Sequence, residues 1–329
     1  MKPMMKTIFR RAALAAFAVC LPAAGIAQSL ASKPISIVIP FAAGGPTDSI
    51  GRMLAQAMTT ALGQTVIVDN RAGAGGTVAT GLVARAQPDG HTLLLHHIGM
   101  STAPALYRKL NFNPLQDFEF IGQIADVPMT VVGRADLPAT SQQEFVAYMK
   151  KGGKSINLAH AGLGAASQLC GMLLQQALGT EVTTVPYQGT APAITALMGG
   201  QVDVMCDQTV QTLSYIKSNK VKMFGVTTPE RLKAIAQEPT MREAGLKDFS
   251  VVVWHGLYAP KGTPPRVLEQ LNQLLRTALK DPQLVKRLDD LGVQIVAPHL
   301  QTPEGLRSQL SQEIARWTPL IRAAGTYAD

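Results

Sequence analysis

The stretch ISIVIPFAAGGPTD, residues 35–48, decides the fold. Its first seven residues are rich in β-branched side chains, which predicts a buried strand. A loop of small residues follows, and apolar residues then recur at helical spacing from Ile50 until Gly63, where the helix is expected to end. Thr47 or Asp48 is the expected N-cap of this helix. A strand that leads through a glycine-rich loop into a helix is the repeating unit of an α/β fold.

The same unit recurs outward from this stretch. Short runs of β-branched residues predict strands at 65–68, 92–95, 155–159, 182–185, 202–205, 221–227 and 251–259. Helical spacing and capping residues predict helices between most of these strands, among them one that opens with a capping box at Thr140 and Gln143. Three helices are expected at the end of the chain, about 265–279, from Pro282 to Gly292, and from Thr302. The order favours parallel sheets flanked by helices.

Length and composition predict two domains. The chain has 329 residues, and about 150 residues per domain is a common size. It is 47% hydrophobic and 16% charged, which excludes a disordered or collagen-like chain and a small disulfide scaffold. We expect residues 28–125 to form the first part of domain 1 and residues 126–226 to form domain 2. Residues 227–329, which include the C-terminal helices, are expected to return to domain 1.

The first 27 residues read as an export signal. Basic residues precede a short apolar run, 12–21, and small residues end at Ala27, where we expect cleavage. We therefore expect an exported protein; Sec and twin-arginine export both stay open. The segment carries Lys2, Lys6, Arg10 and Arg11 and no acidic residue, so its removal lowers the net charge from +8 to +4. No run of five basic residues remains, and nucleic-acid binding loses its support.

Two cysteines remain beyond this segment, Cys170 and Cys206. In an exported protein they can pair, but the sequence does not show whether their geometry allows it. We favour two reduced, buried cysteines. No cluster of histidine, cysteine and acidic residues has the spacing of a metal site, and no cofactor is expected.

Glycine-rich or hydroxyl-rich loops lie between strands and helices in both halves of the chain. Examples are Gly44-Gly45, Gly75-Gly76 and the run from Gly162 to Gly164. Glycine lets a backbone approach a ligand closely, and helix N-termini attract anions. Ligands of open α/β sheets bind beyond the carboxyl ends of the strands. Two lobes with such loops would form a clamp for a small carboxylate.

Two enzyme motifs compete with this interpretation. Residues 162–167, GLGAAS, resemble a dinucleotide fingerprint, but no acidic residue ends the next strand. Residues 99–103, GMSTA, approach a nucleophile elbow, so an exported serine hydrolase using Ser101 stays an alternative. His96, His97 and His160 are expected to be packing or hydrogen-bonding groups.

Seven stretches resemble one family, the substrate-binding proteins of tripartite tricarboxylate transporters, or Bug proteins. They are PFAAGGPTDSIGR (40–52), GQTVIVDNRAGAGGT (63–77), PDGHTLLL (88–95), HAGLGAAS (160–167), VPYQGTAPA (185–193), GGQVDVMCDQ (199–208) and WHGLYAPKGTP (254–264). The resemblance implies a two-lobe Venus-flytrap of the type II periplasmic class, a non-enzyme that captures a small carboxylate and delivers it to membrane permease subunits. A sensing module for a receptor kinase is a further alternative.

The resemblance also implies which residues contact the ligand. In domain 1 they are Phe41, Ala43, Gly44, Gly45, Thr47, Asp48, Ala74, Gly75, Gly76, Thr77, Ser101 and Thr102. In domain 2 they are His160, Ala161, Gly162, Gly164, Ala165, Ser167, Gly189, Thr190 and Asp207.

This sequence departs from the family pattern at two places. Residues 69–72 read DNRA where many relatives have Glu-Asn-Arg-Pro, and Ala165-Ala166 stand where hydroxyl side chains are common. The alanines remove polar contacts and leave more room in domain 2. We therefore expect an aromatic carboxylate as an alternative to a dicarboxylate or tricarboxylate.

Overall fold

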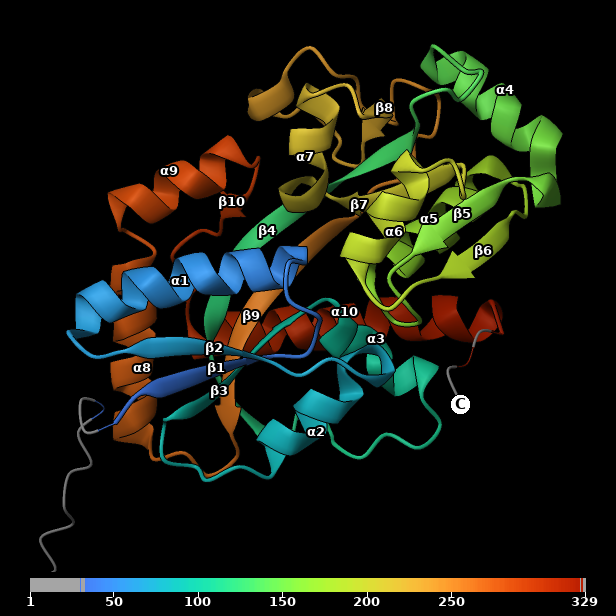
Figure 1. The fold of residues 1–329 in the computed structure, drawn as a ribbon. Coiled ribbons are helices and arrows are strands. Elements are labelled where there is room, and N and C mark those ends of the chain that lie inside the picture. The colour runs from blue at the N-terminus through green and yellow to red at the C-terminus, as the bar shows by residue number, and fades with distance from the viewer. Residues whose placement is uncertain (1–29, 31–32, 326, 328–329) are drawn as a thin grey trace, which may run out of the picture.

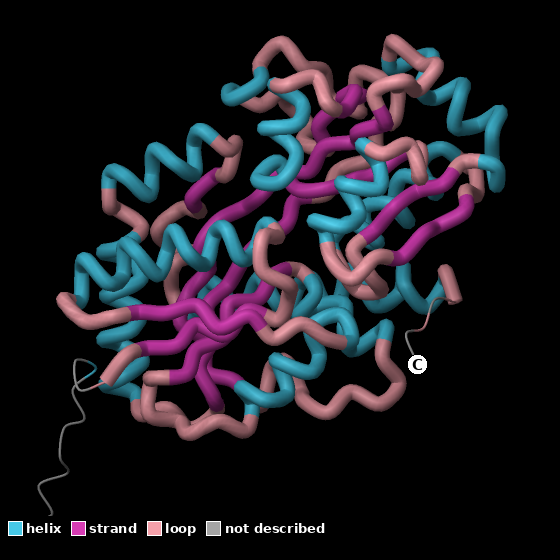
Figure 2. The backbone as a smooth tube through the Cα atoms, in the orientation of Figure 1, coloured by secondary structure: helices cyan, strands magenta, loops and turns pink. Residues whose placement is uncertain are grey.

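The computed structural model describes residue 30, residues 33–325 and residue 327. The expected export signal lies outside these residues. Figures 1 and 2 show two lobes joined by long strands that run through both, with helices packed on the outside of each lobe. The strands follow the order β2-β1-β3-β9-β4-β7-β5-β6, with β8 and β10 paired to β4.

The first lobe is built on the strand of residues 35–39 that opened the sequence. Its strands are β1 (Ile35–Ile39), β2 (Val66–Asn70), β3 (Thr92–His97), β9 (Val252–Pro260), β10 (Gln294–Ile295) and the first part of β4 (Phe118–Arg134). β1 runs parallel to β2 and β3, whereas β9 is antiparallel to β3. Ile37 and Ile39 are fully buried, as the β-branched run predicts.

Six α-helices of the described chain cover the first lobe. They are α1 (Pro46–Leu62), α2 (Thr77–Ala84), α3 (Gly99–Leu106), α8 (Pro265–Ala278), α9 (Pro282–Asp290) and α10 (Pro303–Ala323), and the 3₁₀ turn η2 (Ala74–Gly76) precedes α2. The expected stop at Gly63 is confirmed, because that residue is left-handed with φ 70°. The Asp281 side chain caps α9 by accepting the Leu284 N–H at 2.8 Å.

The second lobe repeats the arrangement. It contains β5 (Asn157–His160), β6 (Thr183–Pro186), β7 (Val204–Gln208), β8 (Val221–Val226) and the last part of β4. Its helices are α4 (Gln142–Gly152), α5 (Ala166–Leu178), α6 (Thr190–Met198) and α7 (Thr209–Lys217), with 3₁₀ turns η3 (Gly153–Ser155) and η4 (Lys233–Ile235). The capping box lies one residue later than expected: Ser141 accepts the Glu144 N–H, and the Glu144 carboxylate accepts the Thr140 N–H.

β4 connects the lobes without a break. It pairs with β9 from Phe118 to Pro128, with β7 from Met129 and with β8 from Thr130. The expected parallel order is confirmed for β1–β3 and β5–β7. β4 is antiparallel to β7, β8, β9 and β10, so each sheet is mixed.

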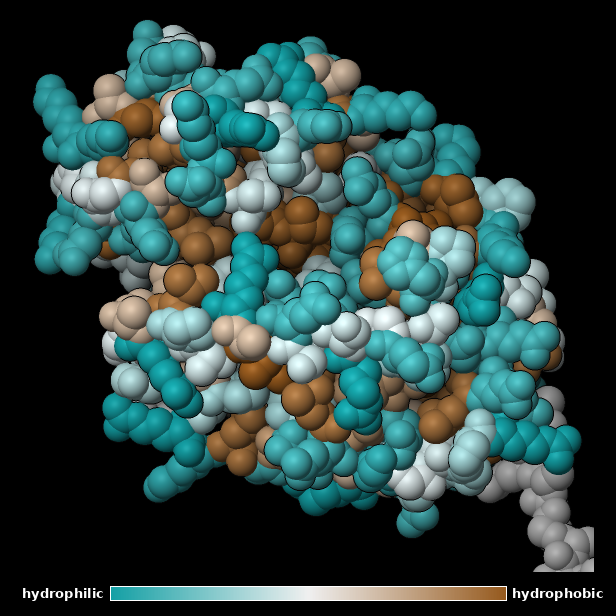
Figure 3. Space-filling model, turned by 180° about the vertical axis from the view of Figure 1, so that it is seen from behind, coloured by the Kyte–Doolittle hydropathy of each residue, from teal (hydrophilic) through white to brown (hydrophobic). Residues whose placement is uncertain are grey.

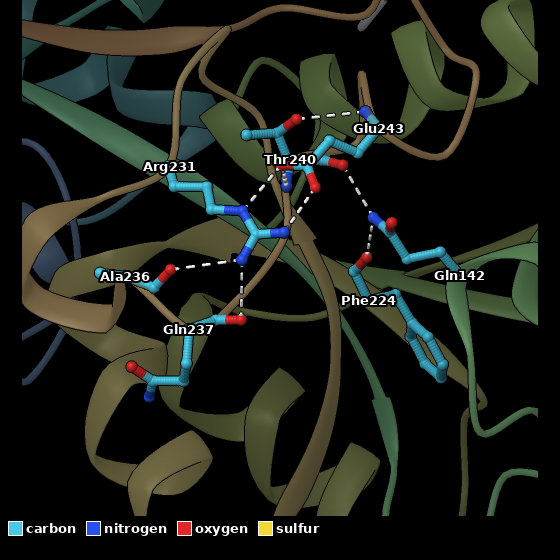
Figure 4. Close-up of polar contacts among 7 residues, drawn as sticks. All are labelled: Gln142, Phe224, Arg231, Ala236, Gln237, Thr240 and Glu243. Atoms are coloured by element: carbon cyan, nitrogen blue, oxygen red, sulfur yellow. Dashed lines mark hydrogen bonds and ion pairs between the residues drawn. The ribbon is translucent and has the colours of Figure 1, made fainter.

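The segment between β8 and β9 packs on the second lobe. Arg231 stabilises this segment through hydrogen bonds within it (Figure 4). Its Nε and Nη2 donate to the Glu243 carboxylate at 2.9 and 2.6 Å, and its Nη1 donates to the Ala236 and Gln237 carbonyls. The Gln142 amide of α4 donates to carbonyls of both β8 and this segment. We therefore propose that the return to domain 1 begins with β9 rather than at residue 227.

The face opposite the view of Figure 1 carries both hydrophilic and hydrophobic residues. Seen from behind, hydrophobic residues form separate patches among polar ones (Figure 3). Among the described helices, none combines the length and the apolar character that crossing a membrane needs.

Candidate functional site

A cleft of about 390 Å³ lies between the lobes. The loop from β1 to α1, η2 and the end of β3 line it from the first lobe. The loops before α5 and α6 and the end of β7 line it from the second. All of these segments follow the carboxyl end of a strand that has a parallel neighbour, which is where α/β sheets bind ligands.

Most of the expected contact residues line this cleft. They are Phe41, Ala43, Gly45, Thr47, Ala74, Gly75, Gly76, Ala161, Gly162, Ala165, Ser167, Gly189, Thr190 and Asp207. The cleft lining does not include Gly44, Asp48, Thr77, Ser101, Thr102, His160 or Gly164. Their expected contact with a ligand is not supported by this geometry.

Three helices begin at the cleft. α1 starts at Pro46, α5 at Ala166 and α6 at Thr190, and these residues all line the cleft wall. N–H groups in the first turn of a helix have no partner within the helix and carry partial positive charge. None of the described residues that line the cleft is a lysine or an arginine. Any attraction for an anion at this cleft must therefore come from backbone N–H groups and uncharged side chains.

Asp48 shapes the first-lobe loop from within. The N-cap of α1 is Gly45, which has extended backbone and no side-chain cap, so the expectation of Thr47 or Asp48 was wrong. Proline at the first helical position makes Gly45 the last non-helical residue. The Asp48 carboxylate accepts the Gly44 N–H at 2.9 Å and Arg52 Nε at 3.0 Å. Burial opposes ionisation of Asp48, but these hydrogen bonds prevail and lower its pKa.

Neutral histidines support the first-lobe wall. The His97 ring lines the cleft and stacks on Phe41, with centroids 4.3 Å apart. Its Nδ1 accepts the Gly99 N–H, so the neutral ring carries its proton on Nε2. Behind it, His255 Nε2 pairs with the Thr47 hydroxyl at 3.2 Å. Burial holds the pKa of His97 well below its usual value and lowers that of His255 to about 4.

Asp207 is the only carboxyl group among the described residues that line the cleft. It lies in β7 and is 1% exposed. One carboxyl oxygen accepts the Gln208 N–H at 2.8 Å, and the other has no partner in the described chain. Burial raises the pKa of Asp207 to about 7, and the hydrogen bond from the Gln208 N–H opposes that rise.

A disulfide joins Cys170 of α5 to Cys206 of β7, with the Cα atoms 6.0 Å apart. The expectation of two reduced cysteines was therefore wrong. Both side chains are fully buried, and α5 packs directly against β7. The bond lies one residue from Asp207 and four from Ala166, so it connects two walls of the second-lobe site.

Ser101 is not arranged as a nucleophile. It is fully buried in the first turn of α3, and its hydroxyl donates to the Ile98 carbonyl at 2.6 Å. His160, the last residue of β5, accepts the Gly162 N–H of the loop that follows. In the described part of the chain, no group of three histidine, cysteine or acidic side chains could hold a metal ion.

Sequence reasoning missed several cleft residues, notably His97, Tyr107, Leu163, Tyr187 and Gln208. Two of them end parallel strands: His97 is the last residue of β3, and Gln208 is the last of β7. Tyr187 comes directly after β6. The carboxyl end of each strand was therefore the signal that could have found them.

A two-lobe α/β fold with a cleft at the junction, where three helices begin, is typical of a solute-binding protein. The sequence model of the tripartite tricarboxylate transporter family receptor matches residues 50–326. The chain therefore belongs to this family of periplasmic solute-binding proteins. It is 46% identical over 309 residues to a UPF0065 protein from the TAR-I ttuE-ttuC′ intergenic region of Agrobacterium vitis, covering 94% of this chain and 89% of that protein.

Solved structures give the same assignment. The periplasmic binding protein BugD is 47% identical, with a TM-score of 0.86 over 90% of this chain and 99% of its own. MatC of Rhodopseudomonas palustris with bound malate is 38% identical, with a TM-score of 0.84, and the match covers 88% of this chain and 99% of MatC. The R. palustris protein Rpa4515 with adipate is 28% identical, with a TM-score of 0.85, and the match covers 90% of this chain and 98% of that protein. The hydrolase and receptor-kinase alternatives find no support among these proteins.

Proposed function

We propose that this protein captures a small organic carboxylate between its lobes and presents it to the permease subunits of a tripartite transporter. The ligand leaves unchanged, because the protein binds and does not catalyse. We also propose that residues 1–27 direct export and are removed near Ala27.

The observation that carries this proposal is the convergence of three helix N-termini on a cleft without cationic side chains. Backbone N–H groups and helix dipoles stabilise an anion without a buried counter-ion. The lobes then close around the bound anion because the closed form binds it more tightly.

We propose two ligand classes for this cleft. The malate and adipate bound by the neighbours favour an aliphatic dicarboxylate. The apolar residues Ala165 and Ala166 at the start of α5, with Phe41 and Tyr187 elsewhere in the lining, favour an aromatic carboxylate. We place the dicarboxylate first, because two relatives hold one.

A thermal-shift screen tests both classes. Purified protein is heated with malate, succinate, adipate, citrate, benzoate or nicotinate, with glucose as a neutral control. A ligand at 100 times its Kd stabilises the folded state by about 2.7 kcal/mol, which raises Tm measurably. A rise with dicarboxylates alone supports the first class, and a rise with aromatic acids alone supports the second. No rise with any acid, repeated by calorimetry, overturns the proposal.

A further inference from the structure

Three glycines lie where the two lobes meet, and two of them, Gly75 and Gly189, also line the cleft. Gly75 belongs to η2 of the first lobe, and Gly164 and Gly189 belong to the second-lobe loops before α5 and α6. All three have positive φ, at +59°, +78° and +122°. The sequence suggested that such glycines let the backbone approach a ligand. Their surroundings indicate a different use.

Gly75 has no room for a side chain. A Cβ there would overlap the hydroxyl oxygen of Tyr107 and the carbonyl oxygen of Leu163. Tyr107 follows α3 in the first lobe, whereas Leu163 belongs to the second-lobe loop between β5 and α5. The Leu163 carbonyl is backbone, so it cannot turn aside as the end of a flexible side chain could. The two lobes therefore touch at Gly75 with no space for a methyl group.

The other two glycines also face the opposite lobe. A Cβ at Gly164 would lie 3.4 Å from Leu106 Cδ1 of α3. A Cβ at Gly189 would lie 3.5 Å from Ala42 Cβ, in the loop between β1 and α1. Both are ordinary van der Waals distances. We call these three glycines with Leu163 the glycine seam.

We propose that the glycine seam is the contact that closes the cleft over its ligand, and that Gly75 is glycine because closure requires it. The inference rests on the proposed capture of a ligand between lobes. A methyl group at 75 must push the Leu163 backbone, and with it the second lobe, away from the first. Apparent affinity falls in proportion to the fraction of molecules that can close.

The first test compares Gly75→Ala with Gly63→Ala. Gly63 has a similar φ of +70° and nothing within 4 Å of its Cβ position, so it carries the same backbone strain without the overlap. The carboxylate that most stabilises the wild type serves as the probe, in calorimetry and stopped-flow dissociation. We expect Gly75→Ala to bind about tenfold or more weakly and to release the probe faster, with Gly63→Ala unchanged. Equal affinity of the two variants overturns the proposal.

The second test needs no ligand. Ala42→Cys with Gly189→Cys places two Cβ atoms at about the separation found in disulfides, roughly 3.5–4.5 Å. Mild oxidation should cross-link the lobes, and peptide mass spectrometry separates this bond from Cys170–Cys206. Adding Gly75→Ala should slow the cross-link about tenfold, whereas adding Gly63→Ala should not. If the double variant does not cross-link although both single-cysteine variants melt like the wild type, the proposal that the lobes meet at the glycine seam is overturned.

The two tests keep the proposals apart. If the wild type binds no carboxylate, the proposed function fails. The cross-linking experiment still shows whether the lobes meet at the glycine seam. If the wild type binds and Gly75→Ala binds equally well, the seam fails and the proposed function stands.

Discussion

At the scale of single residues, Asp207 is the cleft group whose charge state matters most. Its pKa is raised to about 7 by burial, and one of its oxygens has no partner in the described chain. The neutral acid can donate a hydrogen bond to a ligand carboxylate. The ionised acid would repel the same ligand across a short distance in a medium of low polarity.

We predict that affinity for a carboxylate falls as pH rises through 7. The pKa of Asp207 in the folded protein is raised from the usual 3.8 to about 7. The protonated carboxyl, which favours binding of a carboxylate, is therefore lost as the pH rises through about 7. Above pH 7, binding takes up a proton, and Kd rises up to tenfold per pH unit. Calorimetry from pH 5.5 to 8.5 measures the slope. Asp207→Asn should be flat over this range; an equal slope in that variant would contradict the assignment.

At the scale of elements, the disulfide ties α5 to β7. It links residues 36 apart in the sequence, and both ends lie beside the cleft. Cross-linking lowers the entropy of the unfolded chain. The bond also keeps the N-terminus of α5 at a set position relative to Asp207.

We predict that replacing both cysteines by alanine lowers the free energy of unfolding by about 4 kcal/mol. Each single variant should lose about as much as the double variant, because either change removes the whole bond. Urea unfolding under non-reducing conditions measures the loss. Dithiothreitol should destabilise the wild type and leave the double variant unaffected. Losses that add across the two single variants would argue against the bond.

At the scale of the whole molecule, α10 anchors the chain end to a strand that joins the lobes. One Glu313 oxygen accepts both indole N–H groups, from Trp254 of β9 at 3.3 Å and from Trp317 of α10 at 2.9 Å. Figure 1 shows α10 running behind β4 and β9. Both tryptophans are buried, so these donors depend on Glu313.

We predict that Glu313→Leu destabilises the protein by about 2–4 kcal/mol, since it leaves two buried N–H groups unpaired. Glu313→Gln keeps an acceptor oxygen and should lose about 1 kcal/mol or less. Chemical denaturation followed by tryptophan fluorescence reports both the stability and the environment of the two indoles. Equal losses in the two variants would show that packing, not hydrogen bonding, sets the cost.

Much of the fold could be read from local patterns. The strand at 35–39, the helix stop at Gly63 and the Asp281 cap each depend on a few consecutive residues. The loops of the site were likewise visible, because glycines and hydroxyl residues follow strands. Side-chain roles were harder to predict: Asp48 looked like a cap or a ligand contact, yet it holds its own loop through Gly44 and Arg52.

The sequence by itself determined the α/β units, the two-lobe plan and the family, because these follow from patterns repeated along the chain. Only the tertiary structure decided which residues share the cleft, which cysteines pair and where the lobes touch. Thr47 and His255 meet across 208 residues, and the disulfide spans 36. Such contacts depend on how β4 and β9 place one lobe against the other, and no local pattern records that placement.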